Sequence, residues 1–323
     1  MIIRLSLALL GLTAAFACAP ARAEPDRSCF ARSLPAEVRD SRVDDVKFLL
    51  GWAFDVAAAH KPLAAGEEID KASGLSDVPG FGGATDLSAL RGRYRVIRAP
   101  LSAGTGYYGI ELAALDENGD AEGLYLLNRL FRMPVLLQEP IGFATDIVTN
   151  GAMLFGGGTD AIEDLKRAAD TAFVDAAAMR LPLLTVGQSQ AGGEAQLQAA
   201  YLAATHPGRD SRVGFVTFNA ARVNLSVRHL GLAPDAVEGI NFVKDLDPGF
   251  GPHGILPNEI GLQVYIHPDG TGGVSAGDQS FFAAAAHPGE HLLNRFDHVS
   301  LAAALRDSLA SLPSRCDRLA SSP

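Results

Sequence analysis

The chain is short of basic residues, with 27 Lys and Arg against 37 Asp and Glu and a formal net charge of −10. A nucleic-acid surface needs clustered Lys and Arg, so we expect no nucleic-acid partner. Cysteine is scarce as well, with three among 323 residues, and no repeat or low-complexity linker divides the sequence. After the opening segment no apolar run is long enough to span a bilayer. These absences favour one large acidic domain without a membrane helix.

The first 23 residues have the composition of a secretory signal peptide. Arg4 supplies the positive end, residues 5–17 supply the apolar stretch, and Ala21-Arg22-Ala23 forms a small-x-small cleavage site. Cleavage after Ala23 would change the formal charge from −10 to −12, because Arg4 and Arg22 leave with the peptide. We therefore expect a secreted or periplasmic protein in which residues 24–323 form a single domain.

Cysteine usage agrees with export, because only Cys29 and Cys316 would remain after cleavage. Thiols in an oxidising compartment tend to pair, so we expect a disulfide between these two residues. In the chain-entropy model, closing so long a loop stabilises the fold by roughly 4 to 5 kcal/mol. Two free buried thiols are the alternative, and addition of two alkyl labels without reductant would rule out the bridge.

Alternation of helical and strand-like segments predicts an α/β fold. Asn118-Gly119, between two strand-like runs, indicates a hairpin turn. A calcium loop starting at Asp116 is excluded, because Ala121 and Leu127 stand where that loop needs Gly and Glu. Thr159 is a predicted N-cap. We expect helices over 35–60, 160–179, 190–206 and 299–312, and strands over 94–99, 107–115, 123–131, 183–186, 213–218, 239–243 and 260–267.

The most informative stretch is LPLLTVGQSQAGG, residues 181–193. It predicts a buried strand, a sharp turn at Ser189 and a helix, the arrangement of a G-x-S-x-G nucleophile elbow. Gly187 fills the first position of that pattern, and Ala191 stands in the last. Alanine is the smallest change from glycine, and Gly192 and Gly193 keep the next helical turn thin. An ordinary glycine-rich loop between a strand and a helix is the alternative.

A serine nucleophile needs a histidine to accept its proton and a carboxylate to orient that histidine. In α/β-hydrolases the three residues follow in the order Ser, Asp, His. Asp245 and Asp247 come directly after an apolar run, at the strand end where such sheets place their active sites. His298 precedes the last predicted helix, and Asp297 beside it is interpreted as the N-cap of that helix. His253 and His291 remain as further candidates, whereas His60 and His206 are assigned to helix ends and His229, His267 and His287 to loops.

Three segments resemble the class 3 lipases of the α/β-hydrolase superfamily, over about residues 94–304. The elbow GQSQAGG is similar to that family's Gly-His-Ser-Leu-Gly-Gly, and VTFNAARV, residues 216–223, is similar to Thr-Phe-Gly-x-Pro-Arg-Val. FVKDLDP, residues 242–248, resembles a strand that ends in Asn-Asp. The resemblance implies an α/β-hydrolase fold with Ser189, Asp247 and His298 as the triad, and Asp245 as the reserve acid.

The same resemblance implies an oxyanion hole. Its first donor would be the backbone N–H of Gln190, and its second would come from the end of the strand predicted over 123–131, near Leu130. The chain differs from the family here, since Asn128-Arg129-Leu130 stands where relatives carry Arg-Gly-Thr or Arg-Gly-Ser. Loss of one such donor lowers rates by roughly two to three orders of magnitude.

These residues favour a secreted serine hydrolase that cleaves carboxylic esters, with lipid esters among the candidate substrates. No metal or organic cofactor is implied, and the expected partner is an ester molecule, with transient contact to a lipid surface if that ester is a lipid. Two alternatives remain open, an acyltransferase with the same triad and a noncatalytic binding protein on a hydrolase scaffold.

Overall fold

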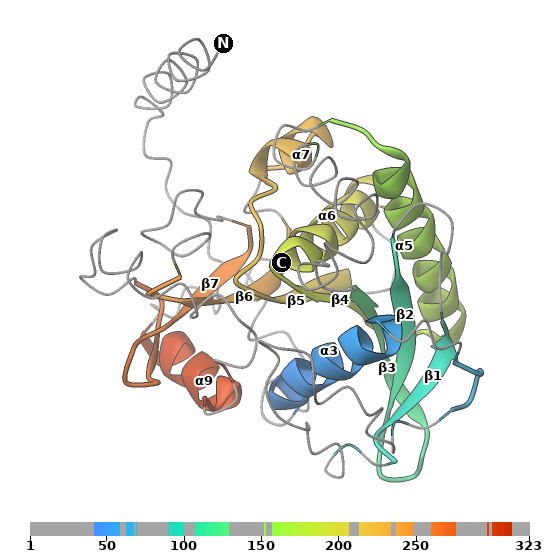
Figure 1. Cartoon of the computed structure of the whole chain (residues 1–323), viewed down its shortest axis with the longest axis horizontal. Helices are drawn as coiled ribbons and strands as arrows, with labels where there is room; N and C mark the ends of the chain where they lie inside the picture. Colours follow the sequence, from blue (N-terminus) through green and yellow to red (C-terminus); the bar gives the residue numbers. More distant parts are fainter. Residues whose placement is uncertain are drawn as a thin grey trace, which may run out of the picture.

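The fold is a three-layer α/β arrangement in which one sheet lies between two layers of helices (Figure 1). The computed structural model describes residues 42–58, 63–67, 69, 90, 92–99, 107–128, 152, 157–206, 213–233, 237–247, 260–275, 296 and 299–311. The expected signal peptide and both cysteines of the expected disulfide, Cys29 and Cys316, lie outside these residues. None of the described helices has the length and apolar character that crossing a membrane requires.

The sheet has eight strands that neighbour one another in chain order, β1-β2-β3-β4-β5-β6-β7-β8. The neighbours from β3 to β7 are parallel, whereas the β1-β2, β2-β3 and β7-β8 pairs are antiparallel. The strands are β1 Tyr94–Arg98, β2 Gly109–Leu115, β3 Ala121–Asn128, β4 Leu183–Gln188, β5 Val213–Phe218, β6 Gly239–Lys244, β7 Leu262–Ile266 and β8 Gly272–Gly273. The predicted α/β class, with a mostly parallel central sheet, is therefore confirmed.

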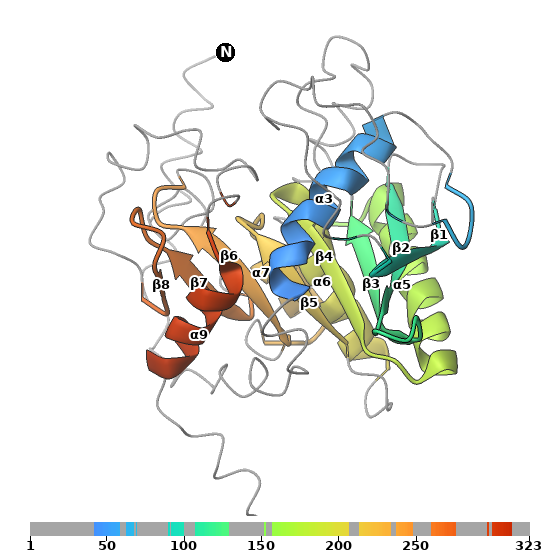
Figure 2. The ribbon, with the colours of Figure 1, turned by 90° about the horizontal axis from the view of Figure 1, so that it is seen from below.

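Helices cover both faces of the sheet (Figure 2). The connections from β3 through β6 carry α5 (Asp160–Met179), α6 (Gln190–Thr205) and α7 (Asn224–His229), which lie on one face. The other face carries α3 (Val43–Ala58) and α9 (Leu301–Ser311), which contact each other. Helix α5 has the predicted bounds, and Thr159 Oγ1 accepts the N–H of Ile162 at 3.2 Å, so the predicted N-cap is confirmed.

Alternate residues of the central strands pack into different layers. In β4, Leu184 and Val186 join the apolar core beneath α3 and α9, whereas Thr185 turns to the other face, where its hydroxyl donates to Ala195 O of α6 at 2.7 Å. In β5, Phe215 packs with residues of α5 and α6. Burial of both faces explains why the parallel strands read as nearly continuous apolar runs.

Two sequence-based assignments at element ends are wrong. Residues 224–229 form α7, so His229 belongs to a helix rather than a loop. The last helix begins at Leu301, and Ser300 Oγ accepts the N–H of Ala303 at 3.2 Å, so Ser300, not Asp297, stands next to the helix start. The short strand β8, which pairs with β7, was not predicted.

Candidate active site

Ser189 lies between β4 and α6 with φ 56° and ψ −122°. This is a left-handed backbone conformation, which costs a non-glycine residue about 1 to 3 kcal/mol and persists only where the surroundings impose it. Three hydrogen bonds impose it here. The Ser189 N–H donates to Phe218 O at 3.0 Å, and Ser189 O accepts from Ala221 N at 2.7 Å and from Gly193 N at 3.1 Å. The serine is thus held at a sharp turn at the carboxyl end of a central strand, and it is partly exposed.

The small residues around Ser189 are required by close backbone approach. A Cβ on Gly187 would lie 2.0 Å from Ala191 O, and a Cβ on Gly192 would lie 2.8 Å from the Ala220 methyl group. Ala191, in the last position of the elbow pattern, is fully buried in the core beneath α3. The Ala191 methyl group is therefore accommodated in the core. The close contact with Ala220, in the segment after β5, is made by Gly192 instead.

The segment after β5 departs from the lipase sequence pattern at its first residue, which has a positive φ. Asn219 stands where the lipase segment has glycine, and it adopts φ +42°. Asparagine tolerates this region better than most residues because its short polar side chain bonds locally. Here Asn219 Oδ1 accepts the N–H of Lys244 at 2.9 Å, which ties the end of β5 to the end of β6. The adjoining Ala221 N–H supports the elbow.

Both candidate acids are buried beyond the end of β6. Strand β6 ends at Lys244, and the Asp247 N–H donates back to Lys244 O at 3.0 Å, so the chain turns here instead of continuing as a strand. Asp245 Oδ2 lies 2.6 Å from His267 Nδ1. The relative exposure of Asp247 is 0%. Residues two apart face the same side only if the strand continues through them. Because β6 ends before Asp245, the carboxylates of Asp245 and Asp247 have different surroundings.

The Asp245–His267 pair is a polar contact that sequence reasoning missed, because His267 was assigned to a loop. Asp245 and His267 also follow Ser189 in the chain order Ser, Asp, His. The distance of His267 from Ser189 therefore decides whether this pair could belong to the triad. In the register of the sheet, Gln188, Phe218, Phe242 and Val264 lie level. His267 follows β7, three strands from β4, and strands about 4.8 Å apart put it about 14 Å from the elbow. A histidine and a serine side chain do not span that gap.

His298, the predicted base, and its neighbour Asp297 lie outside the described residues, whereas Phe296 and Val299 are described. Phe296 is fully buried and Val299 is buried, and the Val299 N–H donates to Phe296 O at 3.0 Å. Phe296 packs edge-on against Phe218, the last residue of β5, with ring centroids 5.3 Å apart. The segment on either side of His298 therefore packs against the sheet near the carboxyl end of β5, the strand next to the elbow strand.

The predicted second oxyanion donor, Leu130, also lies outside the described residues, whereas the strand end before it is described. Asn128 ends β3, next to the elbow strand, and its Nδ2 donates to Val186 O at 3.2 Å and Gln198 Oε1 at 2.8 Å. Its Oδ1 accepts from the Tyr107 hydroxyl at 2.7 Å. Burial raises the pKa of Tyr107, so the phenol stays a protonated donor. Asn128 is thereby fixed beside β4.

Gln190 is the first residue of α6, where backbone N–H groups have no acceptor within the helix and the helix dipole favours negative charge. Its side chain is buried and donates from Nε2 to Glu194 Oε1 at 3.0 Å, which keeps the long amide along the helix. The backbone of Gln190 is thus in the place that the elbow pattern gives to an oxyanion donor.

The chain matches no protein-family model and no curated protein. Among solved structures it is similar to the extracellular lipase LipA from Serratia marcescens, with 15% identity and a TM-score of 0.37, covering 69% of this chain but only 40% of that lipase. It is also similar to lipase II from Rhizopus niveus, with 16% identity and a TM-score of 0.33 over 64% and 78% of the two chains. The chain is also similar to the Rhizomucor miehei lipase propeptide complex, with 12% identity and a TM-score of 0.38 over 89% of this chain and 94% of that one. Likenesses this weak assign neither a family nor an activity.

Proposed function

We propose that the protein is a secreted serine hydrolase of carboxylic esters, built on an α/β-hydrolase scaffold of the class 3 lipase type. The observation that carries the proposal is the backbone of Ser189, which is held at φ 56° by three hydrogen bonds between β4, β5 and α6. Residues held in such sparsely populated backbone conformations cluster at active sites. A serine fixed on such a turn projects its hydroxyl away from the sheet, where an acyl carbon can approach it.

In the proposed reaction Ser189 Oγ attacks the acyl carbon while His298 accepts the hydroxyl proton. The Gln190 N–H and a donor near Leu130 bind the oxyanion that forms. His298 then gives its proton to the leaving alcohol, which departs and leaves an acyl group on Ser189. A water molecule, deprotonated by His298, attacks this acyl group, and collapse of the second intermediate returns the carboxylic acid and the free serine.

We propose Asp247 rather than Asp245 as the carboxylate that orients His298. Asp245 already binds His267 at 2.6 Å, and His267 follows β7, which lies beyond β6 in the strand order from the elbow strand β4. Asp247 is fully buried in the turn after β6, and burial favours a strong bond to an imidazolium. The expected effect of Asp247→Asn is a loss of roughly 10⁴-fold in kcat, because the amide holds the wrong tautomer of the base. Asp245→Asn is the matched comparison and is expected to cost far less.

The test is labelling of the folded protein with a fluorophosphonate probe, followed by hydrolysis of esters that differ in acyl length. Wild type is expected to label at Ser189 and Ser189→Ala is expected to be inert in both assays. Ser226→Ala, which changes a buried serine on α7, serves as the control and should label normally. If wild type does not label, or if Ser189→Ala hydrolyses esters at the wild-type rate, the proposed function is wrong.

A further inference from the structure

The first turns of helix α3 connect two regions that are far apart in the sequence. Helix α3 runs across the sheet face opposite α5 and α6, with the antiparallel strands β1 and β2 on one side of it and α9 on the other (Figures 1 and 2). Four charged side chains at its start are buried or partly buried: Arg42, directly before the helix, and Asp44, Asp45 and Lys47 within it. Buried charges are costly unless they are paired, so their partners show what the helix holds together.

Two of these side chains bind the segment that carries His298. Lys47 is 6% exposed, and its Nζ donates to Phe296 O at 3.2 Å and to Val299 O at 3.0 Å. In the sequence these two carbonyls stand on either side of Asp297 and His298. Asp44 Oδ1 accepts the N–H of Leu301 at 2.7 Å, which fixes the helix start directly after the same segment.

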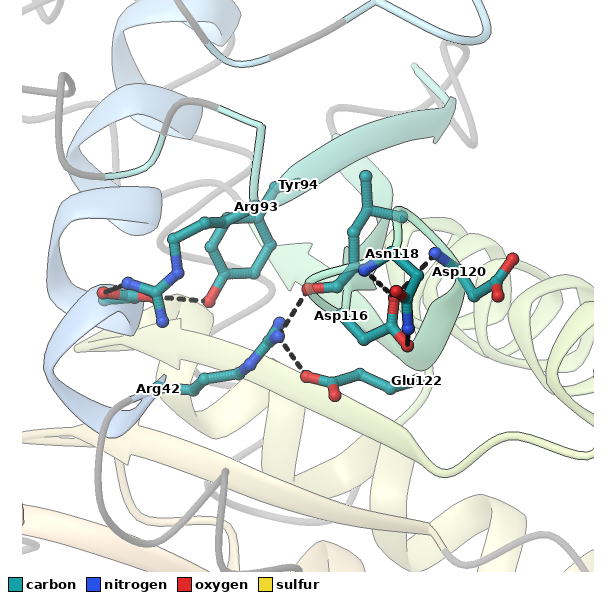
Figure 3. A network of polar contacts seen from close by, with 9 residues as sticks. Arg42, Arg93, Tyr94, Asp116, Asn118, Asp120 and Glu122 are labelled. Atoms are coloured by element: carbon teal, nitrogen blue, oxygen red, sulfur yellow. Dashed lines mark hydrogen bonds and ion pairs between the residues drawn. The ribbon is translucent and has the colours of Figure 1, made fainter.

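The other two side chains bind the antiparallel edge of the sheet. Figure 3 shows Arg42 directed at Glu122, with which it forms an ion pair, and its Nη2 also donates to Leu115 O at 2.6 Å. Asp45 accepts from the Tyr94 hydroxyl at 2.8 Å and from Arg93 Nη1 at 3.1 Å. The adjacent residues Asp44 and Asp45 therefore bind opposite sides, because Asp44 binds the start of α9 whereas Asp45 binds Arg93 and Tyr94 at β1.

We propose that Lys47 and Asp44 are positioning residues that fix the backbone around His298 so that its imidazole meets Ser189 and Asp247. The inference rests on the proposed function. A general base works only within hydrogen-bond reach of the proton it removes, and a misplacement of about 1 Å costs about 10²-fold in rate. A lysine with two carbonyl acceptors, at residues 296 and 299, fixes both flanks of the histidine at once. An apolar side chain of the same length fills the space but leaves both carbonyls without this donor.

The experiment compares Lys47→Met and Asp44→Ala with Asp45→Ala, a matched control on the neighbouring residue of the same helix. The rate constant for fluorophosphonate labelling is measured per folded molecule, together with kcat, KM and the midpoint of thermal unfolding. Lys47→Met is expected to label about 10²-fold more slowly than wild type, with kcat reduced and KM unchanged. Asp44→Ala is expected to label about tenfold more slowly, because Lys47 still holds the segment. Asp45→Ala should lower the midpoint and keep the wild-type labelling rate.

The outcomes separate this inference from the proposed function. If wild type does not label, the proposed function fails. If wild type labels and folded Lys47→Met and Asp44→Ala label at its rate, the positioning role is wrong. It is also wrong if Asp45→Ala slows labelling as much as Asp44→Ala does, because the effect would then follow stability alone. Should Lys47→Met not fold, Asp44→Ala against Asp45→Ala decides the matter, since Asp44 is partly exposed and less costly to remove.

Discussion

The elbow after β4 and the hairpin turn between β2 and β3 both depend on glycine, but for opposite reasons. At the elbow, Gly187 has no side chain because Ala191 O occupies the place where a Cβ would lie. At the hairpin, Gly119 has nothing within 4 Å of that place and is needed only for its φ of +83°. The turn is closed by its own residues, since Asp116 Oδ1 accepts the N–H of Asn118 at 2.8 Å. Packing from other elements fixes the elbow, whereas the hairpin turn is fixed locally.

The largest expected effect follows from adding one methyl group at the elbow. Gly187→Ala would place a Cβ 2.0 Å from Ala191 O, a backbone atom of α6 that cannot move without shifting the helix. We expect a loss of about 3 kcal/mol or more in the free energy of unfolding, which overpacking of this severity produces. Labelling of Ser189 should be lost as well, because the turn and the helix start move together. Urea unfolding and fluorophosphonate labelling measure the two effects.

The same substitution at the hairpin turn is the control. Gly119→Ala meets no atom within 4 Å, so only the left-handed backbone is penalised, at about 1 kcal/mol. Its labelling rate should equal that of wild type. Equal losses of stability in the two variants would show that the elbow tolerates the methyl group and that steric closeness is not what selects glycine there.

The sequence predicted those parts of the fold in which neighbouring residues set the geometry. The Asn118-Gly119 turn and the capped helix over 160–179 are of this kind, and the structure has both. The elbow was predicted from its small residues, because the close approach of other elements that fixes it also requires those residues. The contact between His267 and Asp245 joins two strand ends that are 22 residues apart, and no local pattern reveals it. The left-handed backbone of Asn219 is likewise accompanied by a contact with Lys244 of another strand, which no local pattern reveals.

The antiparallel edge near the hairpin carries a buried acid that no sequence motif reveals. Glu111 of β2 is fully buried, 3.7 Å from Arg98 Nε, and burial together with the nearby Asp175 carboxylate raises its pKa to about 7. Asp175 belongs to α5, and Arg98 Nη2 donates to it at 2.8 Å. The pKa of Glu111 thus depends on a helix 64 residues further along the chain, so only the folded structure reveals this site.

The second prediction is that this acid makes stability fall as pH rises. The folded pKa of Glu111, about 7, lies above the reference value of 4.5, so the folded state binds the proton more tightly. Its stabilising contribution is complete below pH 4.5 and is lost as pH rises through 7. The loss in unfolding free energy is about 3 kcal/mol by linkage, at about 1.4 kcal/mol for each unit by which the pKa is raised. Glu111→Gln removes this slope, and urea midpoints measured across that pH range test it.

Glu163→Gln is the matched control for that experiment. Glu163 is an acid on α5 whose side chain is 56% exposed, so its removal should leave the pH dependence of stability unchanged. A slope that persists in Glu111→Gln, or that disappears in Glu163→Gln, would place the titrating group elsewhere. Labelling at Ser189 should be the same in both variants at a pH where each is folded, since the elbow lies on other strands.

The smallest expected effect tests whether the elbow stores strain at Ser189 itself. Ser189→Gly and Ser189→Ala both remove the nucleophile, so neither should label, but only glycine adopts φ 56° and ψ −122° without steric cost. Relief of that strain is partly offset by the greater freedom of glycine in the unfolded chain, and we expect the glycine variant to be more stable than the alanine variant by about 1 kcal/mol. Thermal unfolding of the two variants side by side measures the difference. If alanine is the more stable, the hydrogen bonds to Phe218 O and from the N–H groups of Ala221 and Gly193 hold an unstrained residue. The backbone of Ser189 then no longer supports a catalytic role.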